Sequence, residues 1–249
     1  MSGHSKWSQI KRKKAVLDAK RGARFTRLIR EITVATRAGG GDPDGNPRLR
    51  LAIETAKSQN MPQDNIDRGI KKGTGELEGV NYEEAIYEGY GPGGAAILIE
   101  VTTDNLNRTV AEIRHAFSKH GGNLGAPNSV AWMFDRRGQL YLDAATLDED
   151  TALEAALDAG AEDMVMEGDQ YIVSTDPASL HSVRENLIGA SLKPEDAEIG
   201  MIPKSTVQVT GKDAEKLLKL MSALDDNDDV SKVFSNFDID AATLAAAGE

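Results

Sequence analysis

The 249-residue sequence contains no cysteine, and aromatic residues make up only 5% of it. Without cysteine the chain can form neither a disulfide, nor a thiolate nucleophile, nor a cysteine-ligated zinc site. Few aromatic side chains mean that the buried cores must consist mostly of Ala, Val, Leu and Ile. The lack of cysteine suits a reducing compartment, and we expect a cytoplasmic protein.

The sequence also lacks the segments that direct a chain to a membrane. No apolar run approaches the roughly 18 residues of a membrane span. The first ten residues contain no apolar signal core. We therefore expect no membrane partner.

Signals of catalysis are missing as well. The four histidines do not have the spacing of a metal site, and neither a nucleotide-binding P-loop nor a nucleophile elbow occurs. Carboxylates are abundant, but no pair of them stands out as a general acid and base. We therefore expect no enzymatic activity, no cofactor, no metal and no small-molecule substrate.

Charge is divided unevenly along the chain. Residues 1–75, here named the head, contain 17 Lys and Arg against 7 Asp and Glu, a net charge of +10. Residues 76–249, the body, contain 12 against 33, a net charge of −21. An acidic body repels nucleic acid, so this division predicts polyanion binding confined to the head. The alternative interpretation is a charge pattern that only aids solubility.

The head is expected to be helical and to hold the phosphate contacts. Residues 16–37 place apolar side chains at helical spacing, with bases on the opposite side of the same helix. Four consecutive bases at residues 11–14 indicate a phosphate-binding arm before it. Trp7 beside the arm either stacks on a base or anchors the arm. The expected nucleic-acid contacts are Lys6, Lys11, Arg12, Lys13, Lys14, Lys20, Arg24, Arg27 and Arg30.

Two further helices are expected in the head. Asn46 before Pro47 predicts a helix start, because asparagine caps a helix and proline fits its first turn. A third helix begins near Pro62 and is expected to stop at Gly73. The glycine-containing residues 73–79 predict a linker to the body.

The body alternates paired strands with single helices, the pattern of antiparallel sheets covered by helices on one face. Residues 80–120 give an incomplete strand, strand and helix, which the strand, helix and strand of residues 204–237 would complete. We therefore expect an α+β multidomain fold: a helical N-terminal domain and two antiparallel-sheet, ferredoxin-like α+β domains, one inserted in the other. The inserted domain is expected to open with two strands joined by a turn. The expected domains are 1–75, then 80–128 with 204–240, and the insertion 129–203; the two opening strands are 130–134 and 139–142.

Two short motifs are interpreted as structural. A G-x-G-x-x-G pattern at residues 89–94 is followed by a strand and not by a helix, which favours a turn between strands over a dinucleotide site. Residues 225–229 resemble the start of a calcium loop, but the required glycine and glutamate are absent, so we expect a solvated turn. The glycine turn can still present its backbone to a partner. The expected partner surface is Gly89, Tyr90, Gly91, Pro92, Gly93 and Gly94.

Longer motifs occur in order along almost the whole chain, and together they resemble the YebC/PmpR family. One departure is Leu106, where that pattern has arginine, so one basic contact is missing if this run touches a partner. The motifs are Gly3-His4-Ser5-Lys6-Trp7, Ala19-Lys20-Arg21-Gly22, Asn46-Pro47-Arg48-Leu49-Arg50, Asn60-Met61-Pro62-Gln63-Asp64-Asn65-Ile66, Tyr87-Glu88-Gly89-Tyr90-Gly91-Pro92-Gly93-Gly94, Thr102-Thr103-Asp104-Asn105 with Asn107-Arg108-Thr109, and Gly121-Gly122-Asn123-Leu124-Gly125.

The resemblance implies a three-domain cytoplasmic regulator of gene expression without a cofactor. Family members are commonly described as DNA-binding transcriptional regulators, which is the function that we expect. The alternative is a ribosome-associated translation factor that binds rRNA and eases synthesis of proline-rich stretches, since a mitochondrial branch of the family activates translation. Attraction to phosphate does not distinguish DNA from rRNA, and the oligomeric state stays open.

Overall fold

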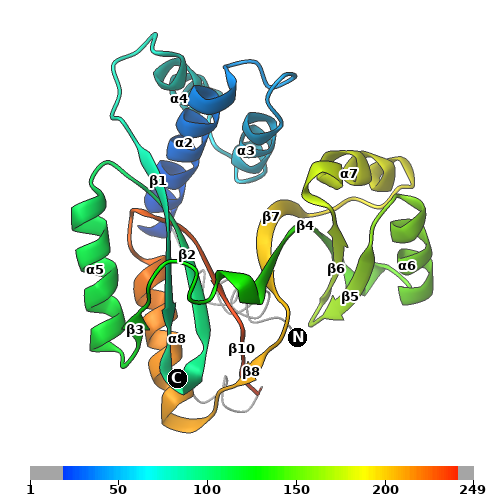
Figure 1. Cartoon of the computed structure of the whole chain (residues 1–249). Helices are drawn as coiled ribbons and strands as arrows, with labels where there is room; N and C mark the ends of the chain where they lie inside the picture. Colours follow the sequence, from blue (N-terminus) through cyan, green and yellow to red (C-terminus); the bar gives the residue numbers. More distant parts are fainter. Residues whose placement is uncertain (1–18, 241–249) are drawn as a thin grey trace. The chain divides into compact units, whose positions relative to one another are not determined.

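Three helices follow one another in the head of the computed structural model, which describes residues 19–240 (Figure 1). They are α2 (Ala19–Gly39), α3 (Pro47–Ser58) and α4 (Gln63–Thr74). Their apolar faces meet in a core of small and aliphatic side chains, as the low aromatic content requires. The buried members of this core are Ile32, Ala35, Leu49, Ala52, Ala56, Met61 and Ile66.

The start of α3 confirms the prediction from Asn46 and Pro47. The Asn46 side chain accepts a hydrogen bond from Leu49 N at 3.1 Å, which satisfies one of the free amides of the first turn. Its Nδ2 donates to Ala35 O at 2.8 Å and to Gly40 O at 2.9 Å. The buried Asn46 therefore joins the end of α2 to the beginning of α3.

The sequence predicts that the third helix stops at Gly73, which is wrong. Helix α4 continues to Thr74 and is capped by Gly75 in the left-handed conformation (φ 85°). Gly73 serves packing instead. A Cβ at this position would lie 2.4 Å from Thr36 Cβ and 2.7 Å from Thr33 O, so α2 and α4 approach each other too closely for any side chain. The close approach of two helices, and not a helix end, requires this glycine.

The first sheet is antiparallel and has the order β3-β1-β2-β9. Its strands are β1 (Glu83–Tyr90), β2 (Ala96–Thr103), β3 (Asn123–Leu124) and β9 (Val230–Ser235). The helices α5 (Leu106–Lys119) and α8 (Gly211–Asp225) pack on one face of it through Ile113, Phe117, Leu217 and Leu220. A short parallel pair, β8 (Val207–Gln208) and β10 (Phe237–Asp238), adjoins the same core.

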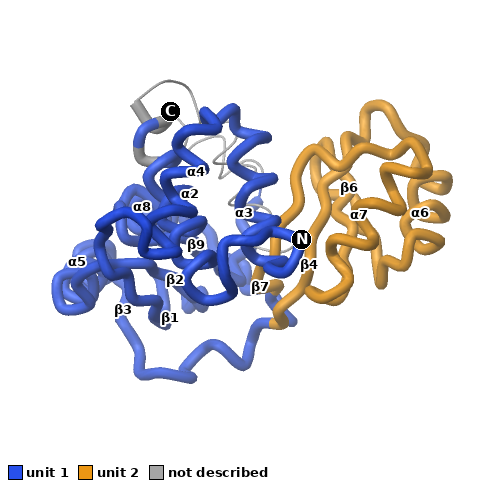
Figure 2. Tube along the Cα trace, turned by 90° about the horizontal axis from the view of Figure 1, so that it is seen from above, with its two compact units in different colours: residues 1–134, 203–249 blue, residues 135–202 orange. Residues whose placement is uncertain are grey.

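Residues far apart in sequence complete this sheet, because β9 pairs antiparallel with β2 from Ile97↔Ser235 to Val101↔Val230. The chain leaves this region after Met133 and returns at Lys204, whose backbone N donates to Met133 O at 2.9 Å. By its contacts the chain divides into two compact units, 1–134 with 203–249 and 135–202 (Figure 2). The expected α+β multidomain fold is confirmed, while the boundaries of its three domains stay a prediction.

The unit of residues 135–202 has a β-α-β-β-α-β order. Its sheet has the order β5-β6-β4-β7 and is covered by two helices through Ala152, Ala156, Val183 and Leu187. This is the ferredoxin-like arrangement that the sequence predicts. Its elements are β4 (Phe134–Asp143), α6 (Glu149–Asp158), β5 (Asp163–Glu167), β6 (Gln170–Thr175), α7 (Leu180–Gly189) and β7 (Asp196–Pro203).

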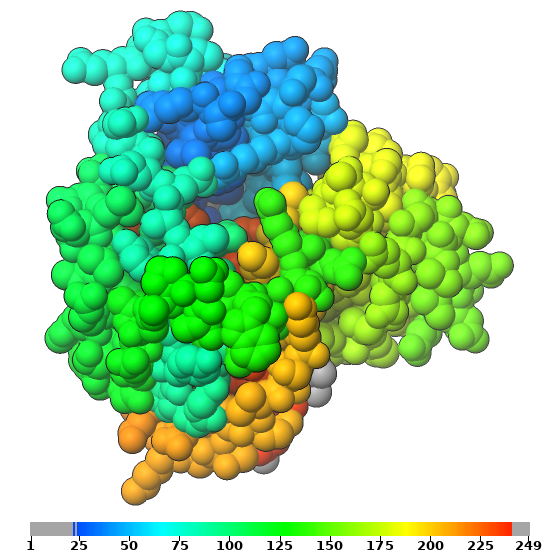
Figure 3. Space-filling model, in the orientation of Figure 1, coloured from blue at the N-terminus to red at the C-terminus, as the bar shows by residue number. Residues whose placement is uncertain are grey.

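The predicted pair of strands over 130–134 and 139–142 is wrong, since one strand, β4, runs through the expected turn. The residues before it form the short 3-10 helix η2 (Ala131–Met133) instead of a strand. One carboxylate binds the backbone of this segment, since Glu88 accepts hydrogen bonds from Asn128 N, Val130 N and Ala131 N at 2.7–2.8 Å. In Figure 3 this segment (green) lies over part of the surface of β1 and β2 (teal).

The Glu88 carboxylate is buried, yet it remains ionised. Burial alone would raise its pKa, but the hydrogen bonds from Val130, Asn128 and Ala131 outweigh burial and hold the pKa below its usual value.

Within residues 19–240, no helix combines the length and the apolar character that crossing a membrane requires.

Because Gly73 lies against α2, we expect Gly73→Ala to lower the free energy of unfolding by about 1–3 kcal/mol, the usual cost of overpacking. Helix propensity alone predicts the opposite sign, since alanine favours a helix by about 1 kcal/mol over glycine. Denaturant unfolding followed by circular dichroism measures the change. Gly189→Ala is the control, because Gly189 ends α7 with no atom within 4 Å of a Cβ; a Gly73→Ala protein as stable as this control would contradict the packing explanation.

Candidate nucleic-acid interface

The nine expected phosphate-binding residues fall into three groups. Five of them belong to the arm and lie outside the described residues: Lys6, Lys11, Arg12, Lys13 and Lys14. Lys20 lies in α2, but its side chain is also outside the description. Arg24 is exposed on α2, as a phosphate contact requires.

Arg27 is directed toward the body. Its Nη2 donates to the backbone oxygens of Asp225 and Asn227, the latter at 3.1 Å, and Nη1 lies 3.9 Å from Asp225 Oδ1. Only 20% of the Arg27 side chain is exposed. The basic side of α2 is therefore not open to solvent at Arg27, and a phosphate contact at this residue stays a prediction.

Arg30, one turn further along α2, contacts the same region. Its Nη1 donates to Asp229 Oδ1 at 3.0 Å, to Asp228 O at 2.6 Å and to Thr102 O at 3.3 Å. The guanidinium also lies 5.4 Å from the ring centre of Tyr82, within cation–π range. With 16% of its side chain exposed, Arg30 likewise does not face open solvent.

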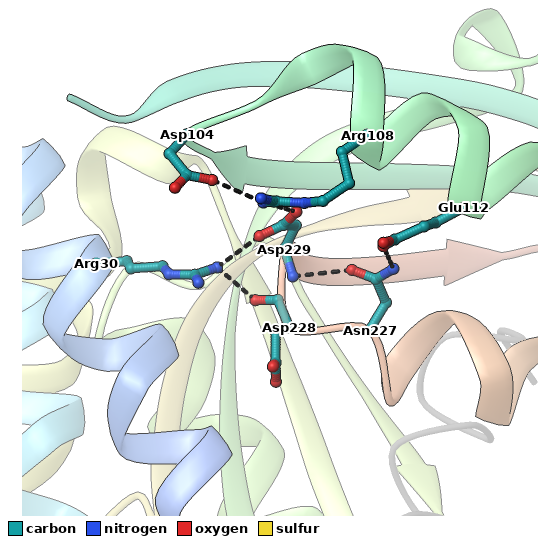
Figure 4. A pocket seen from close by; sticks show the side chains of 7 residues that line it. All are labelled: Arg30, Asp104, Arg108, Glu112, Asn227, Asp228 and Asp229. Carbon is teal, nitrogen blue, oxygen red and sulfur yellow. Dashed lines mark hydrogen bonds and ion pairs between the residues drawn. The ribbon is translucent and has the colours of Figure 1, made fainter. Parts of the chain in front are cut away.

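Asp229 is the centre of this contact (Figure 4). Its Oδ2 accepts hydrogen bonds from Arg108 Nη2 at 2.7 Å, Thr109 Oγ1 at 2.8 Å and Thr103 Oγ1 at 3.0 Å, while Oδ1 faces Arg30. The predicted solvated turn over residues 225–229 is therefore wrong at Asp229, which is only 4% exposed.

The donors around Asp229 decide its charge. Burial alone would raise its pKa, but the hydrogen bonds from Arg108, Thr109 and Thr103 outweigh burial and hold the pKa of the carboxyl below its usual value. The same contact and the ion pair with Asp104 raise the pKa of the Arg108 guanidinium. Asp229 is therefore ionised at neutral pH.

The run Thr103-Asp104-Asn105, followed by Arg108 and Thr109, builds this site. Asn105 caps α5 by accepting from Arg108 N at 3.0 Å, so the helix begins where Arg108 and Thr109 can reach the carboxylate. Sequence motifs had identified this run, but had not connected it with Asp229. No periodicity indicates a partner 120 residues away; only the pairing of β9 with β2 brings them together.

The pocket at this site contains more acid than base. Two guanidinium groups and four carboxyl groups line it, which disfavours a phosphate ligand. Among residues 19–240, no cluster of three or more acidic, histidine or cysteine side chains is arranged to hold a metal ion. The pocket is therefore a joint between head and body, lined by Arg30, Asp104, Arg108, Glu112, Asn227, Asp228 and Asp229.

The glycine turn is only partly accessible. Gly89, Gly91 and Pro92 are buried, so this part of the expected partner surface is wrong. A Cβ on Gly91 would lie 2.7 Å from Leu217 Cδ1, which shows that the glycine is needed for packing against α8. The exposed part of the turn is Tyr90, Gly93 and Gly94.

We expect Asp229→Asn to lower the free energy of unfolding at pH 7 by about 1.5–3 kcal/mol, because hydrogen bonds to a charged acceptor are lost. The folded pKa of Asp229 lies below the unfolded value of about 3.9. The carboxylate therefore stabilises the fold above about pH 4 and ceases to do so as the pH falls through the folded pKa.

The difference between the wild type and the variant should accordingly shrink as the pH is lowered below about 4, in denaturant unfolding measured from pH 7 to pH 2.5. The control is Glu215→Gln, an exposed position on α8, which should change stability by less than about 0.5 kcal/mol. A constant difference across this range would refute the role of the ionised carboxylate.

Known proteins resemble this chain over nearly its full length. Residues 5–76 match the model of the TACO1/YebC protein N-terminal domain, and residues 82–237 match that of the TACO1/YebC second and third domain. A protein from Gemmatimonas aurantiaca is 58% identical, covering 99% of this chain and 100% of its own. One from Acidithiobacillus ferrooxidans is 61% identical and covers 98% of both. Each is named "Probable transcriptional regulatory protein".

A solved structure shares the fold. The crystal structure of a conserved hypothetical protein from Aquifex aeolicus superposes with a TM-score of 0.84 at 51% sequence identity, covering 91% of this chain and 93% of the other. With both family models matched in order and relatives at this level of identity, the chain belongs to the TACO1/YebC family.

Proposed function

We propose that this protein is a nucleic-acid-binding regulator of gene expression that acts in the cytoplasm as a DNA-binding transcriptional regulator. The observation that carries the proposal is the division of charge, +10 in residues 1–75 against −21 in residues 76–249. Phosphates attract the first segment and are repelled by the second. The names of the relatives as transcriptional regulatory proteins support the same function.

The proposed contacts are the cations that remain available on the head. Arg24 is exposed on α2, and Lys57, Arg68 and Lys71 are exposed on α3 and α4. The arm adds the four bases of residues 11–14. These are contacts to phosphate, which fix the position of a protein on a duplex but do not read its sequence.

Fluorescence anisotropy with a labelled DNA duplex, measured at several salt concentrations, tests this proposal. If about five cations meet phosphates, the logarithm of the association constant should fall with log salt at a slope of about −4 to −5. Replacing Lys11, Arg12, Lys13 and Lys14 by glutamine should reduce this slope in magnitude by about 3–4.

The matched control removes four positive charges from the body, by glutamine substitution of the exposed Lys119, Lys193, Lys212 and Lys216. It should leave the slope within about one unit of the wild type. If both variants lose binding to the same extent, net charge and not the head determines affinity, and the assignment to the head is refuted.

The preference for DNA is tested in the same assay with an RNA hairpin and with purified ribosomes as competitors. Duplex DNA should compete with the labelled duplex at lower concentration than either of them. Ribosomes that compete better than DNA would overturn the transcriptional function in favour of the translation factor.

A further inference from the structure

The acidic loop, defined as Asp225–Asp229, occupies part of the basic side of α2. We infer that the Arg27–Arg30 side of α2 is a second phosphate-binding surface, which the acidic loop covers as an internal competitor and which nucleic-acid phosphates uncover. This inference rests on the proposed function, because it concerns the same ligand and the same helix.

The acidic loop offers the two arginines the oxygens that a phosphate would offer. Arg27 contacts the backbone oxygens of Asp225 and Asn227, and Arg30 contacts the backbone oxygen of Asp228 and the carboxylate of Asp229. A guanidinium binds phosphate and carboxylate through the same planar set of N–H donors. A ligand with phosphate oxygens can therefore replace the loop on α2 once this helix has separated from the acidic pocket.

The contact leaves donors unused. Arg27 Nε and Arg30 Nε are buried, and neither has a hydrogen-bond partner among the described residues. A buried N–H without an acceptor weakens the contact that buries it. A phosphate oxygen, or water once the helix has moved away, would satisfy these donors, so exchange of the loop for nucleic acid gains hydrogen bonds.

The acidic loop does not need α2 to remain folded. Asp229 Oδ2 is held by Arg108, Thr109 and Thr103, all of which belong to the body. Only Oδ1 faces Arg30. Release of the head therefore exposes one carboxylate oxygen to water and leaves the network of the body intact.

The head, in turn, does not need the acidic loop. Its buried apolar cluster is separate from the cluster that α5 and α8 form on the sheet. A further ion pair across the joint, Arg48 Nη2 to Glu84 Oε1 at 2.6 Å, joins side chains that are 41% and 46% exposed. Exposed ion pairs contribute little and are screened by salt. Polar and largely replaceable contacts of this kind are typical of domains that move against each other.

Such a competitor lowers the apparent affinity for nucleic acid. If α2 is free in only a fraction of the molecules, the apparent dissociation constant for that surface rises by the inverse of this fraction. A variant that weakens the loop while keeping every cation of the head should therefore bind more tightly.

The test measures binding of a fluorescein-labelled 20-base-pair DNA duplex by full-length Asp229→Asn. We expect the dissociation constant to fall about 5–20-fold relative to the wild type, because more molecules have α2 free. The control is Glu215→Gln, which makes the same change in net charge on exposed α8 and leaves the acidic loop intact. It should stay within about twofold of the wild type.

A second variant avoids the buried network. Asp225→Asn removes the carboxylate that lies 3.9 Å from Arg27 and should tighten binding about 2–3-fold. In parallel, dyes attached to cysteines introduced at Ser58 and Lys212, in a chain without other cysteines, report the distance between α3 and α8. Duplex added at saturating concentration should change energy transfer in the otherwise wild-type protein.

The outcomes separate the two proposals. If neither wild type nor variants bind the duplex, the proposed function fails and this inference fails with it. If the wild type binds, but Asp229→Asn and Asp225→Asn bind no better than Glu215→Gln and energy transfer does not change at saturation, only the internal competition is refuted.

Discussion

One buried carboxylate, that of Asp229, holds together segments from four parts of the chain. Removing an ionised group from water is costly unless donors replace the water. Here the donors come from the end of β2, from the first turn of α5 and from α2. The need of this carboxylate for donors therefore links three features: the cap of α5, the pairing of β9 with β2 and the contact of the head with the body.

The basic residues of α2 are consequently not equivalent, although the sequence presents them as one group. Arg24 is open to solvent, whereas Arg27 and Arg30 bind oxygens of the body. An acidic body thus has two effects on a basic head: it repels the polyanion and it binds part of the surface that would attract it. Both effects lower the affinity of the head for a polyanion.

Local patterns in the sequence predicted most of the fold. Helical spacing, the Asn46-Pro47 start and alternating strands lie in the residues themselves, and the structure confirms them. Gly73 was misinterpreted because a glycine that ends a helix and a glycine that lets two helices approach each other look alike in sequence. The strands before and after residue 135 were misinterpreted for a different reason. The sequence around Val130 does not indicate that its backbone N–H donates to the carboxylate of Glu88, which lies far earlier in the chain.

The candidate site was less predictable, because it depends on contacts between distant residues. The acidic stretch around Asp229 has the composition of a solvated turn, and only the neighbouring threonines and Arg108 show that one of its members is buried. Opposite charges in two parts of a chain predict that they attract, but not which residues meet. Position in the three-dimensional sheet decides that.

The hydrogen bond between Lys204 N and Met133 O has a consequence for the ancestry and the engineering of this chain. It places the exit and the return of a 70-residue excursion, residues 134–203, side by side. The entropic cost of closing a loop grows only with the logarithm of its length. An insertion whose two ends lie side by side therefore lowers the stability of the surrounding domain little, whatever its sequence. The position is therefore a natural point for exchange: a short turn, or a different module with neighbouring termini, can occupy it while β2 and β9 still find each other.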